Sequence, residues 1–535
     1  MKYLRIIILT FVVLNITSCK KMLDVNKDPA FPQTTKAEYL LAPIQFQMAN
    51  NTATDNRVIF KYTQDMVGQD QTTFTIAWEK HGYQSNSDVG GSMWRMVYIG
   101  LGLNLEEMIK EAEASNKWTY AGIGYAIKAW GYQLLTDIHG PVVLDDVFKN
   151  QLEFRYQDQP EVYARVREWS QKALECFNKP DADGVAGLLA GVSGDQIYKG
   201  DRPKWRKFIY GLLAQQYSHF INKPQFNTQY ADSVVKYVDL SFANSTEDAT
   251  INFGGNTSGS GGDSNPFSQN FGIYTATATT SSTFGRIAQP IVNLLTGGVR
   301  GTPAVDPKTS VDPRLTRMIN PVPSTGIYRG AFPFNGNATV PHILGALSGT
   351  SLVPFPGKYL YSNNARYPIM SYAQLQFAKA EALFKKGNSG GALTAYQNGI
   401  RGHMEFINLY GRNGTPAVAV ITPAEINAYM ISSEVAQTGT ALTIADIMQQ
   451  KYIAQWGWAG MEQWSDLRKY HYDPLIYKNY IQLQSGDFFE KNNGKYAYRL
   501  RPRYASEYSF NRNEYNKWGC GEDGYHTLET WSNLP

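Results

Sequence analysis

Apolar residues recur at helical spacing through much of the first half of the chain. Residues 92–114, 118–136, 158–180 and 200–220 each place apolar side chains three or four positions apart, which is typical of one buried helix face. The pattern predicts four helices with these buried side chains: Met93, Met96, Val97, Leu101, Leu105, Met108, Ile123, Ile127, Trp130, Leu134, Leu135, Val162, Val166, Trp169, Ala173, Cys176, Phe177, Trp205, Phe208, Ile209, Leu212 and Leu213.

The ends of these helices are also marked in the sequence. Ser92 can begin the first helix, and the His-Gly-Pro run at 139–141 ends the second. Pro160 and Pro203 fall in first turns, where the missing N–H costs no hydrogen bond, and Asp201 can cap the fourth helix.

Helical spacing returns at Ser371, where Gly387 separates two segments within 371–406. Small and aromatic residues lie near the positions that let the two antiparallel helices of a tetratricopeptide unit approach each other. These residues are Ala380, Leu383, Ala392, Tyr396 and Gly399. Residues 444–474 predict two further helices, so helix pairs recur along the chain.

Turn-forming residues replace this pattern between about residues 243 and 365. A disordered linker is one interpretation of such a composition. The region nevertheless holds too many rings for a solvated tether, and we expect ordered loops packed on a helical scaffold. The rings are Phe253, Phe267, Phe271, Tyr274, Phe284, Tyr328, Phe332 and Phe334.

The first residues have the layout of a secretory signal, with a positive start and an apolar run at 6–14. This run is too short to span a bilayer. A buried N-terminal helix is the alternative, but no polar face accompanies the apolar one. The sequence at 16–19 resembles a bacterial lipoprotein processing site, which implies a signal peptide at 1–18 and lipid attachment to Cys19.

Charge and cysteine content narrow the function classes. Removing residues 1–18 takes away Lys2 and Arg5, which leaves 48 basic against 46 acidic residues and a net charge of +2. Nucleic-acid binding is disfavoured, because such proteins usually show a clustered basic face. Cys176 and Cys520 could pair in an exported protein, but the helical stripe around Cys176 favours a buried thiol there.

No pattern of catalytic or metal-binding residues stands out. The seven histidines lack the paired spacing of a zinc site, and no phosphate-binding loop occurs. A secreted glycoside hydrolase needs two carboxylates about 5–10 Å apart, and the sequence offers only generic acidic pairs at 106–107 and 145–146. We therefore predict that the protein is not an enzyme and has no cofactor, and we assign no residue to a metal site. A helical-repeat scaffold that binds only protein is a further alternative.

Eight motifs, taken together and in order, resemble the SusD/RagB-like nutrient-binding outer-membrane lipoproteins of Bacteroidota. Where His139 stands, the family usually shows an aromatic residue. The motifs are LDVNKDP at 23–29, the helix containing Trp94, LLTDIHGPVVLDD at 134–146, YKGDRPKWRKF at 198–208, DPRL at 312–315, YPIMSYAQLQFAKAEAL at 367–383, KYIAQWGWAGMEQWSDLRK at 451–469 and RPRYASEYSFNRNEYN at 501–516.

The resemblance implies a mainly α fold in which tetratricopeptide-like helix pairs form a scaffold beneath a loop-rich second layer. It also implies one domain over 36–535 after residues 19–35, which hold the lipidated tether and the start of the fold, although length alone would allow two or three domains. Such a protein sits on the cell surface, held in the outer membrane by its lipid. It captures an oligosaccharide or peptide and delivers it to a SusC-like TonB-dependent transporter. Lys20, Lys21 and Asp24 loosely resemble the surface-export signal.

Ligand contacts are expected from rings outside the helical stripes, because sugar faces pack on flat rings. Trp78 is the first candidate, since it lies between predicted helices in a region where the family often carries ligand contacts. The alternative is that Trp78 pins its loop to the core. The other candidates are Tyr83, Asn86 and Asp88 beside it, and Phe267, Phe271, Tyr274, Tyr328 and Phe332 in the ring-bearing loops.

Overall fold

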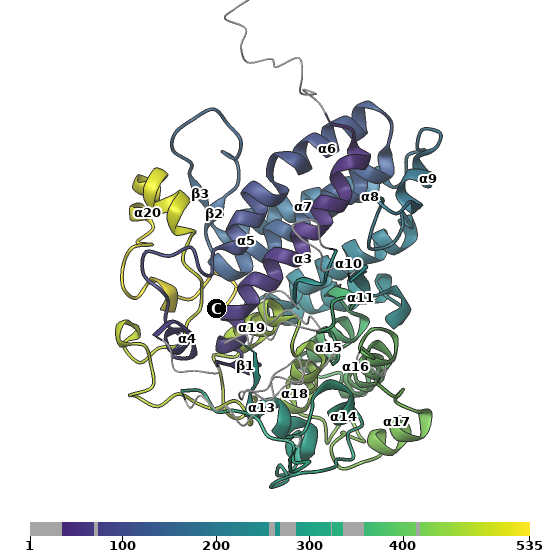
Figure 1. Ribbon diagram of the computed structural model, residues 1–535, viewed down its shortest axis with the longest axis vertical. Coiled ribbons are helices and arrows are strands. Elements are labelled where there is room, and N and C mark those ends of the chain that lie inside the picture. Colours follow the sequence, from purple (N-terminus) through teal and green to yellow (C-terminus); the bar gives the residue numbers. More distant parts are fainter. Residues whose placement is uncertain are drawn as a thin grey trace, which may run out of the picture.

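The computed structural model describes residues 35–68, 73–255, 263–267, 285–322, 324–334, 358–413 and 418–535. Helices dominate this part of the chain, which confirms the predicted fold class (Figure 1). Its strands form short antiparallel pairs: β1 (Met66–Val67) with β5 (Arg286–Ile287), β2 (Val142–Val143) with β3 (Tyr156–Gln157), and β4 (Ala249–Ile251) with β6 (Tyr367–Met370).

A long helix, α3 (Ala37–Tyr62), runs through the centre of the molecule (Figure 1). The hydrophobic pattern did not reveal it, because polar residues such as Gln45 and Asp55 lie on its buried faces. Gln45 donates to Asp195 at 2.7 Å, and Asp55 accepts the N–H of Met93 at 2.8 Å. The buried polar groups of α3 are thus used to position neighbouring elements.

The helix predicted at 92–114 is confirmed but is not regular. It comprises α5 (Ser92–Arg95), a π-helical segment η1 (Met96–Leu101) and α6 (Gly102–Ala114). The predicted stripe from Met93 to Met108 is buried as expected. The extra residue of a π-turn shifts the helical phase, and this explains why the apolar spacing is loose there.

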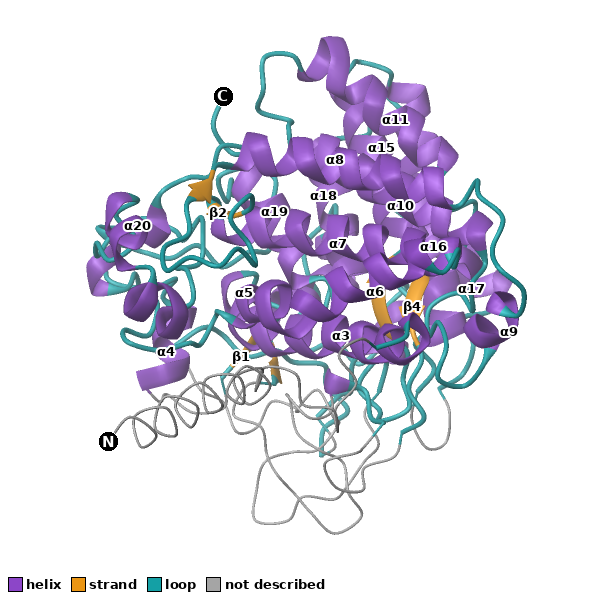
Figure 2. Ribbon diagram, turned by 90° about the horizontal axis from the view of Figure 1, so that it is seen from above, coloured by secondary structure: helices purple, strands orange, loops and turns teal. Residues whose placement is uncertain are grey.

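The next helices begin where the sequence predicts. They are α7 (Trp118–His139), α8 (Gln159–Cys176) and α10 (Arg202–Ser218). Asp158 caps α8, and Asp201 accepts the N–H of Lys204 at 3.0 Å to cap α10. Figure 2 shows α7, α8 and α10 side by side, with α11 (Ala231–Leu240) beyond α10.

The second half of the scaffold begins with α15 (Tyr372–Lys385) and α16 (Ser389–Tyr410), which pack against each other. Gly387 has a positive φ of 78° between them, a conformation that glycine adopts without strain. A Cβ at Gly399 would lie 2.7 Å from Phe377, so the predicted close approach is confirmed. Two further helices follow, α18 (Ile444–Gln455) and α19 (Gly460–Lys469).

The loop-rich region packs on this scaffold where it is described. Phe253, Phe267 and Tyr328 are buried, as expected for ordered loops. Cys176 is a buried free thiol, as predicted, and so is Cys520. The single domain over 36–535 stays a prediction. The remaining helices are α4 (Thr73–Glu79), α9 (Val185–Ala190), α13 (Gln289–Asn293), α14 (Arg314–Met318), α17 (Pro423–Met430) and α20 (Arg512–Lys517), with π-helical turns η2 (Phe226–Tyr230), η5 (Leu294–Gly298) and η7 (Tyr504–Tyr508) and 3-10 turns η3 (Ser245–Glu247), η6 (Glu490–Asn492) and η8 (Tyr525–Thr527).

A buried network of charges joins α15, α18 and α19. Lys469 lies 2.8 Å from both Glu381 and Asp466, and Lys451 lies 2.7 Å from Asp466. All four side chains are at most 3% exposed. A buried charge without a partner is costly, so each of these ions depends on the others.

The network continues to α7 through His219, which follows α10. Its Nε2 lies 3.0 Å from Glu462, and its Nδ1 lies 3.3 Å from Asp137. Burial opposes the charged imidazole, but the two carboxylates outweigh it and raise the pKa of His219 to about 10. His219 therefore carries a positive charge at neutral pH.

We expect Lys469→Met to lower the free energy of unfolding by about 3–5 kcal/mol, because it leaves Glu381 buried without its counter-ion and Asp466 with Lys451 alone. Urea unfolding measures this change. Lys386→Met is the matched control, since its ion pair with Asp232 lies at the surface and should contribute less than about 1 kcal/mol. Equal stability of the two variants would contradict the role of the network.

The contact of charged His219 with Asp137 and Glu462 should make the free energy of unfolding depend on pH. Its pKa is raised in the folded state from about 6.5, so its contribution to stability is complete below pH 6.5 and is lost as the pH rises toward 10. The difference in unfolding free energy between wild type and His219→Gln should therefore shrink from pH 7 to pH 10. A constant difference across that range would show that His219 is not charged in the fold.

Candidate functional site

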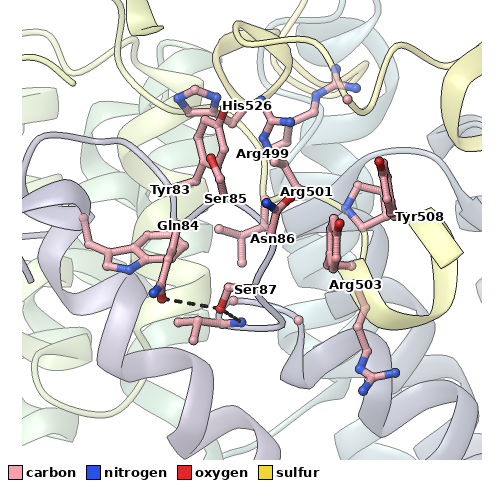
Figure 3. A pocket seen from close by; sticks show the side chains of 18 of the residues that line it. Tyr83, Gln84, Ser85, Asn86, Ser87, Arg499, Arg501, Arg503, Tyr508 and His526 are labelled. Carbon is pink, nitrogen blue, oxygen red and sulfur yellow. Dashed lines mark hydrogen bonds between the residues drawn. The ribbon is translucent and has the colours of Figure 1, made fainter. Parts of the chain in front are cut away.

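A hollow lies where the loop at 81–91 meets the C-terminal segment at 499–526 (Figure 3). Its volume is about 180 Å³. The loop connects α4 to α5, and α20 of the C-terminal segment lies at the same end of the molecule in Figures 1 and 2. Parts of the chain more than 400 residues apart therefore form one site.

The loop is held in a specific conformation by the core beneath it. The Tyr62 hydroxyl donates to the Gly82 carbonyl at 2.6 Å, and the Gly82 N–H donates to the Ala77 carbonyl at 2.7 Å. A Cβ at Gly82 would lie 2.3 Å from Phe489, so only glycine fits there. Asn86 adopts a positive φ of 55°, which asparagine tolerates better than most residues.

Asp88 ties the two sides of the hollow together, although it does not line it. One carboxylate oxygen accepts the Ala505 N–H at 2.7 Å, and the other forms an ion pair with Arg503. Ser87 accepts the Val89 N–H at 3.2 Å and so tightens the turn, as the dashed lines in Figure 3 show. Gln84, Ser85 and Asn86 are left with exposed polar side chains.

Two predicted aromatic residues, Trp78 and Tyr83, line the hollow. Trp78 is only 2% exposed, and its ring packs on Tyr62 with centroids 5.7 Å apart. Its indole N–H has no hydrogen-bond partner among the described residues. Tyr83 is 9% exposed and lies beneath the guanidinium of Arg501, 3.8 Å from its ring centroid. The two rings therefore form the floor and do not project into solvent.

More accessible rings come from residues outside the set of predicted ligand contacts. Tyr504 and Tyr508 line the hollow and stack on each other with centroids 4.5 Å apart and planes 15° apart. Both are half-buried, and Figure 3 shows Tyr508 on the side away from Tyr83. The signal was present in the sequence as two tyrosines four residues apart, which η7 turns to the same side.

Two arginines hold the C-terminal segment in place. Arg499 donates to the Leu528 carbonyl at 2.8 Å and also to the Glu529 carbonyl. Arg501 donates to the Cys520 carbonyl at 2.8 Å. Burial, with the nearby Arg501 charge, lowers the pKa of His526 to about 3, so its imidazole is neutral at physiological pH.

Three other predicted site residues that the structure describes lie away from this hollow. Phe267 is fully buried and stacks on Tyr367 with centroids 4.6 Å apart. Tyr328 is 6% exposed, whereas Phe332 is 51% exposed, and neither lines the hollow. Phe271 and Tyr274 lie outside the described residues. Of the predicted set, Trp78, Tyr83 and Asn86 are brought together here.

The described lining of the hollow offers little for catalysis. Asp523 is its one carboxylate, and it pairs with Lys491 at 2.8 Å. Glycoside hydrolysis needs two carboxyl groups across the scissile bond. Among the described residues, no three His, Cys, Asp or Glu side chains gather so that they could hold a metal ion. Rings, amides and hydroxyls suit binding better than bond cleavage.

Comparison with known proteins shows that one protein family matches most of this chain. The family model SusD-like_2, described as starch-binding associating with outer membrane, matches residues 29–499. No curated protein matches the chain. In the described part of the chain, no helix is both long and apolar enough to cross a membrane.

Several solved structures share the fold. A SusD/RagB family protein from Bacteroides thetaiotaomicron is 22% identical, with a TM-score of 0.66 over 94% of this chain and 99% of that one. A SusD homolog from Bacteroides fragilis is 16% identical, with a TM-score of 0.70 over 94% and 100% of the two chains. A chitin-binding protein is 18% identical, with a TM-score of 0.67 over 93% and 100%.

Proposed function

The chain belongs to the SusD-like family, and we propose that it is a cell-surface lipoprotein that captures a glycan and delivers it to a SusC-like TonB-dependent transporter. The observation that carries the proposal is the hollow, where two stacked, half-buried tyrosines meet exposed amide and hydroxyl side chains. Sugars present both an apolar CH face and a rim of hydroxyls, so one site with rings and hydrogen-bonding groups suits them.

Each part of the hollow has a distinct role in this proposal. Tyr504 and Tyr508 supply the stacking surface, because their rings are the more accessible ones. Gln84 and Asn86 offer amide groups to the hydroxyls of a sugar. Trp78 and Tyr83 form the floor that keeps the loop in place. Asp88 holds the loop against the C-terminal segment through Arg503.

A glycan is favoured over a peptide as the ligand. The family description names starch binding, and one protein of the same fold is a chitin-binding protein. None of the described residues that line the hollow belongs to a strand, so they offer no strand edge to which an extended peptide could add. We place the ligand with the glycans, and its identity among them is a question for screening.

The proposed role is capture without catalysis. Asp523 is the one described carboxylate of the hollow, and Lys491 and Tyr83 already hold it. A hydrolase would need a second acid across the sugar, which this lining does not supply. Binding without cleavage is what a protein that hands an intact glycan to a transporter requires.

Attachment to the membrane would come from lipid on Cys19, which lies outside the described residues. Each buried acyl methylene contributes about 0.8 kcal/mol, so two or more chains give stable anchoring. The described body begins at residue 35 with α3 two residues later. A tether at 19–35 would keep the hollow near the membrane and let the body swing.

A glycan and peptide array with residues 19–535 tests capture. We expect a glycan to bind, and Tyr504→Ala or Tyr508→Ala to weaken its binding about three- to tenfold, since one ring contact is worth on the order of 1 kcal/mol. Tyr237→Ala is the matched control, because Tyr237 of α11 stacks on Tyr217 of α10 in a similar pair of tyrosines that does not line the hollow. Binding that survives both changes would exclude the hollow.

Replacing Trp78 by alanine is a poor test of binding, because removal of a buried ring commonly lowers the free energy of unfolding by about 3–5 kcal/mol. A milder substitution is needed. Trp78→Phe keeps most of the floor while changing the hollow's shape. Its thermal unfolding should be measured beside its binding, so that a lost fold is not taken for a lost contact.

If the array shows neither glycan nor peptide binding, a helical scaffold that binds only protein becomes the better explanation of the fold.

Cys19→Ser should abolish acylation and move the mature protein from the outer-membrane fraction to the soluble fraction. Metabolic labelling with a fatty acid, followed by membrane fractionation, measures both effects. Cys176→Ser keeps Cys19 and should keep the label. A Cys19→Ser protein that stays firmly in the membrane fraction without a label would place the anchor elsewhere.

A further inference from the structure

A second cavity of about 420 Å³ lies on the scaffold, away from the hollow described above. Residues 196–204 before and at the start of α10 form one wall, and residues 246–252 around β4 form another. Arg366 and Tyr410, at the end of α16, complete it. Among the described residues, none lines both cavities. Its volume lies in the range of small-molecule sites.

Three basic side chains line this cavity, namely Lys199, Lys204 and Arg366. Arg366 is fixed in place, because its Nε donates to the Thr250 hydroxyl at 2.6 Å and its Nη2 to the Thr250 carbonyl at 3.1 Å. None of the three forms an ion pair with a carboxylate in the described part of the chain. Three cations at one cavity, none of them in an ion pair, attract an anion.

The carboxyl of Asp248 lies in the same lining and is only 3% exposed. Its Oδ1 accepts the Tyr372 N–H at 2.6 Å, whereas its Oδ2 has no hydrogen-bond partner among the described residues. Burial raises the pKa of Asp248 well above its usual value, and the nearby Glu405 and Glu247 charges raise it further. The unpartnered Oδ2 of Asp248 can accept a hydrogen bond from a ligand hydroxyl.

Two carboxylates lie near the cavity but outside its lining, those of Glu247 and Glu405. Glu247 does not line it and is paired with Lys207 at 2.6 Å. Lys204 also lowers the pKa of Glu247, although less than Lys207 does. Glu405 lies outside the lining as well. Among the described residues that line the cavity, Asp248 is thus the one carboxyl beside Lys199, Lys204 and Arg366.

The remaining walls suit a sugar ring. Tyr198 donates its hydroxyl to the Glu247 carbonyl at 2.7 Å, and Tyr410 donates to the Ser245 carbonyl at 2.9 Å, so both rings are held still. Asn252 and Gln196 add amide groups to the lining. Fixed rings, amides and cations together match a polar ring that carries a negative group.

We propose that this cavity binds an acidic sugar, whose carboxylate or sulfate is held by Lys199, Lys204 and Arg366. Its hydroxyls meet Asn252 and Asp248, and its ring lies between the walls formed by Tyr198 and Tyr410. The site is independent of the hollow at 81–91, so it stands or falls separately from the function proposed above.

Isothermal titration of residues 19–535 with galacturonic acid and with galactose tests the charge requirement. We expect galacturonic acid to bind at least tenfold more tightly than galactose, and added NaCl to weaken it. Galactose 6-sulfate distinguishes the two sources of negative charge, and binding of either acid above galactose supports the site. Equal binding of the acids and galactose, or no binding of any of them, would overturn the proposal.

Lys204→Gln locates the binding. Its side chain has no ion-pair partner, so the fold should persist by circular dichroism while galacturonic acid binding weakens about fivefold or more. Lys110→Gln, an exposed lysine of α6, is the matched charge control, and Tyr508→Ala tests independence from the hollow. Both should leave galacturonic acid binding unchanged. Unchanged binding by Lys204→Gln, or inorganic sulfate binding as tightly as the sugar acids, would overturn the proposal.

Discussion

The buried ion network between α7, α15, α18 and α19 is the constraint on which the rest of the molecule depends. Lys469 and Lys451 meet Asp466 and Glu381 where solvent does not reach, so the helices carrying them can be displaced only by separating buried charges. Apolar packing alone would let neighbouring helices slide by small amounts with little change in buried area. Paired buried charges fix one arrangement of the scaffold.

The same helix transmits this constraint to the hollow. Arg468, next to Lys469 on α19, donates from one nitrogen to the Asp137 carbonyl at 2.7 Å and to the Tyr498 carbonyl at 2.8 Å. Leu500 then donates its N–H to the Ile138 carbonyl at 2.7 Å. The C-terminal segment therefore starts from a fixed point on the scaffold before it forms the wall that carries Tyr504 and Tyr508. A site assembled from residues 81–91 and 499–526 can keep its shape because both segments are tied to this core.

Local chemistry explains which parts of the molecule could be predicted. Helices with an apolar stripe and an explicit cap, such as those begun by Asp158, Asp201 and Ser371, are confirmed because their signals are contained within a few residues. Helix α3 was missed because its buried faces are partly polar, and those polar groups find partners only in the tertiary structure. The loop with Trp78, Tyr83 and Asn86 was selected, but its meeting with Tyr504 and Tyr508 depends on contacts between distant segments, which spacing along the sequence does not record.

The proposed function requires that the hollow between the loop at 81–91 and the C-terminal segment holds a captured glycan. A crystal structure of residues 19–535 with the oligosaccharide that binds most tightly tests it directly. We expect a sugar ring packed against Tyr504 or Tyr508, with its hydroxyls within hydrogen-bonding distance of Gln84 or Asn86. An oligosaccharide bound elsewhere on the molecule, with this hollow empty, would contradict it.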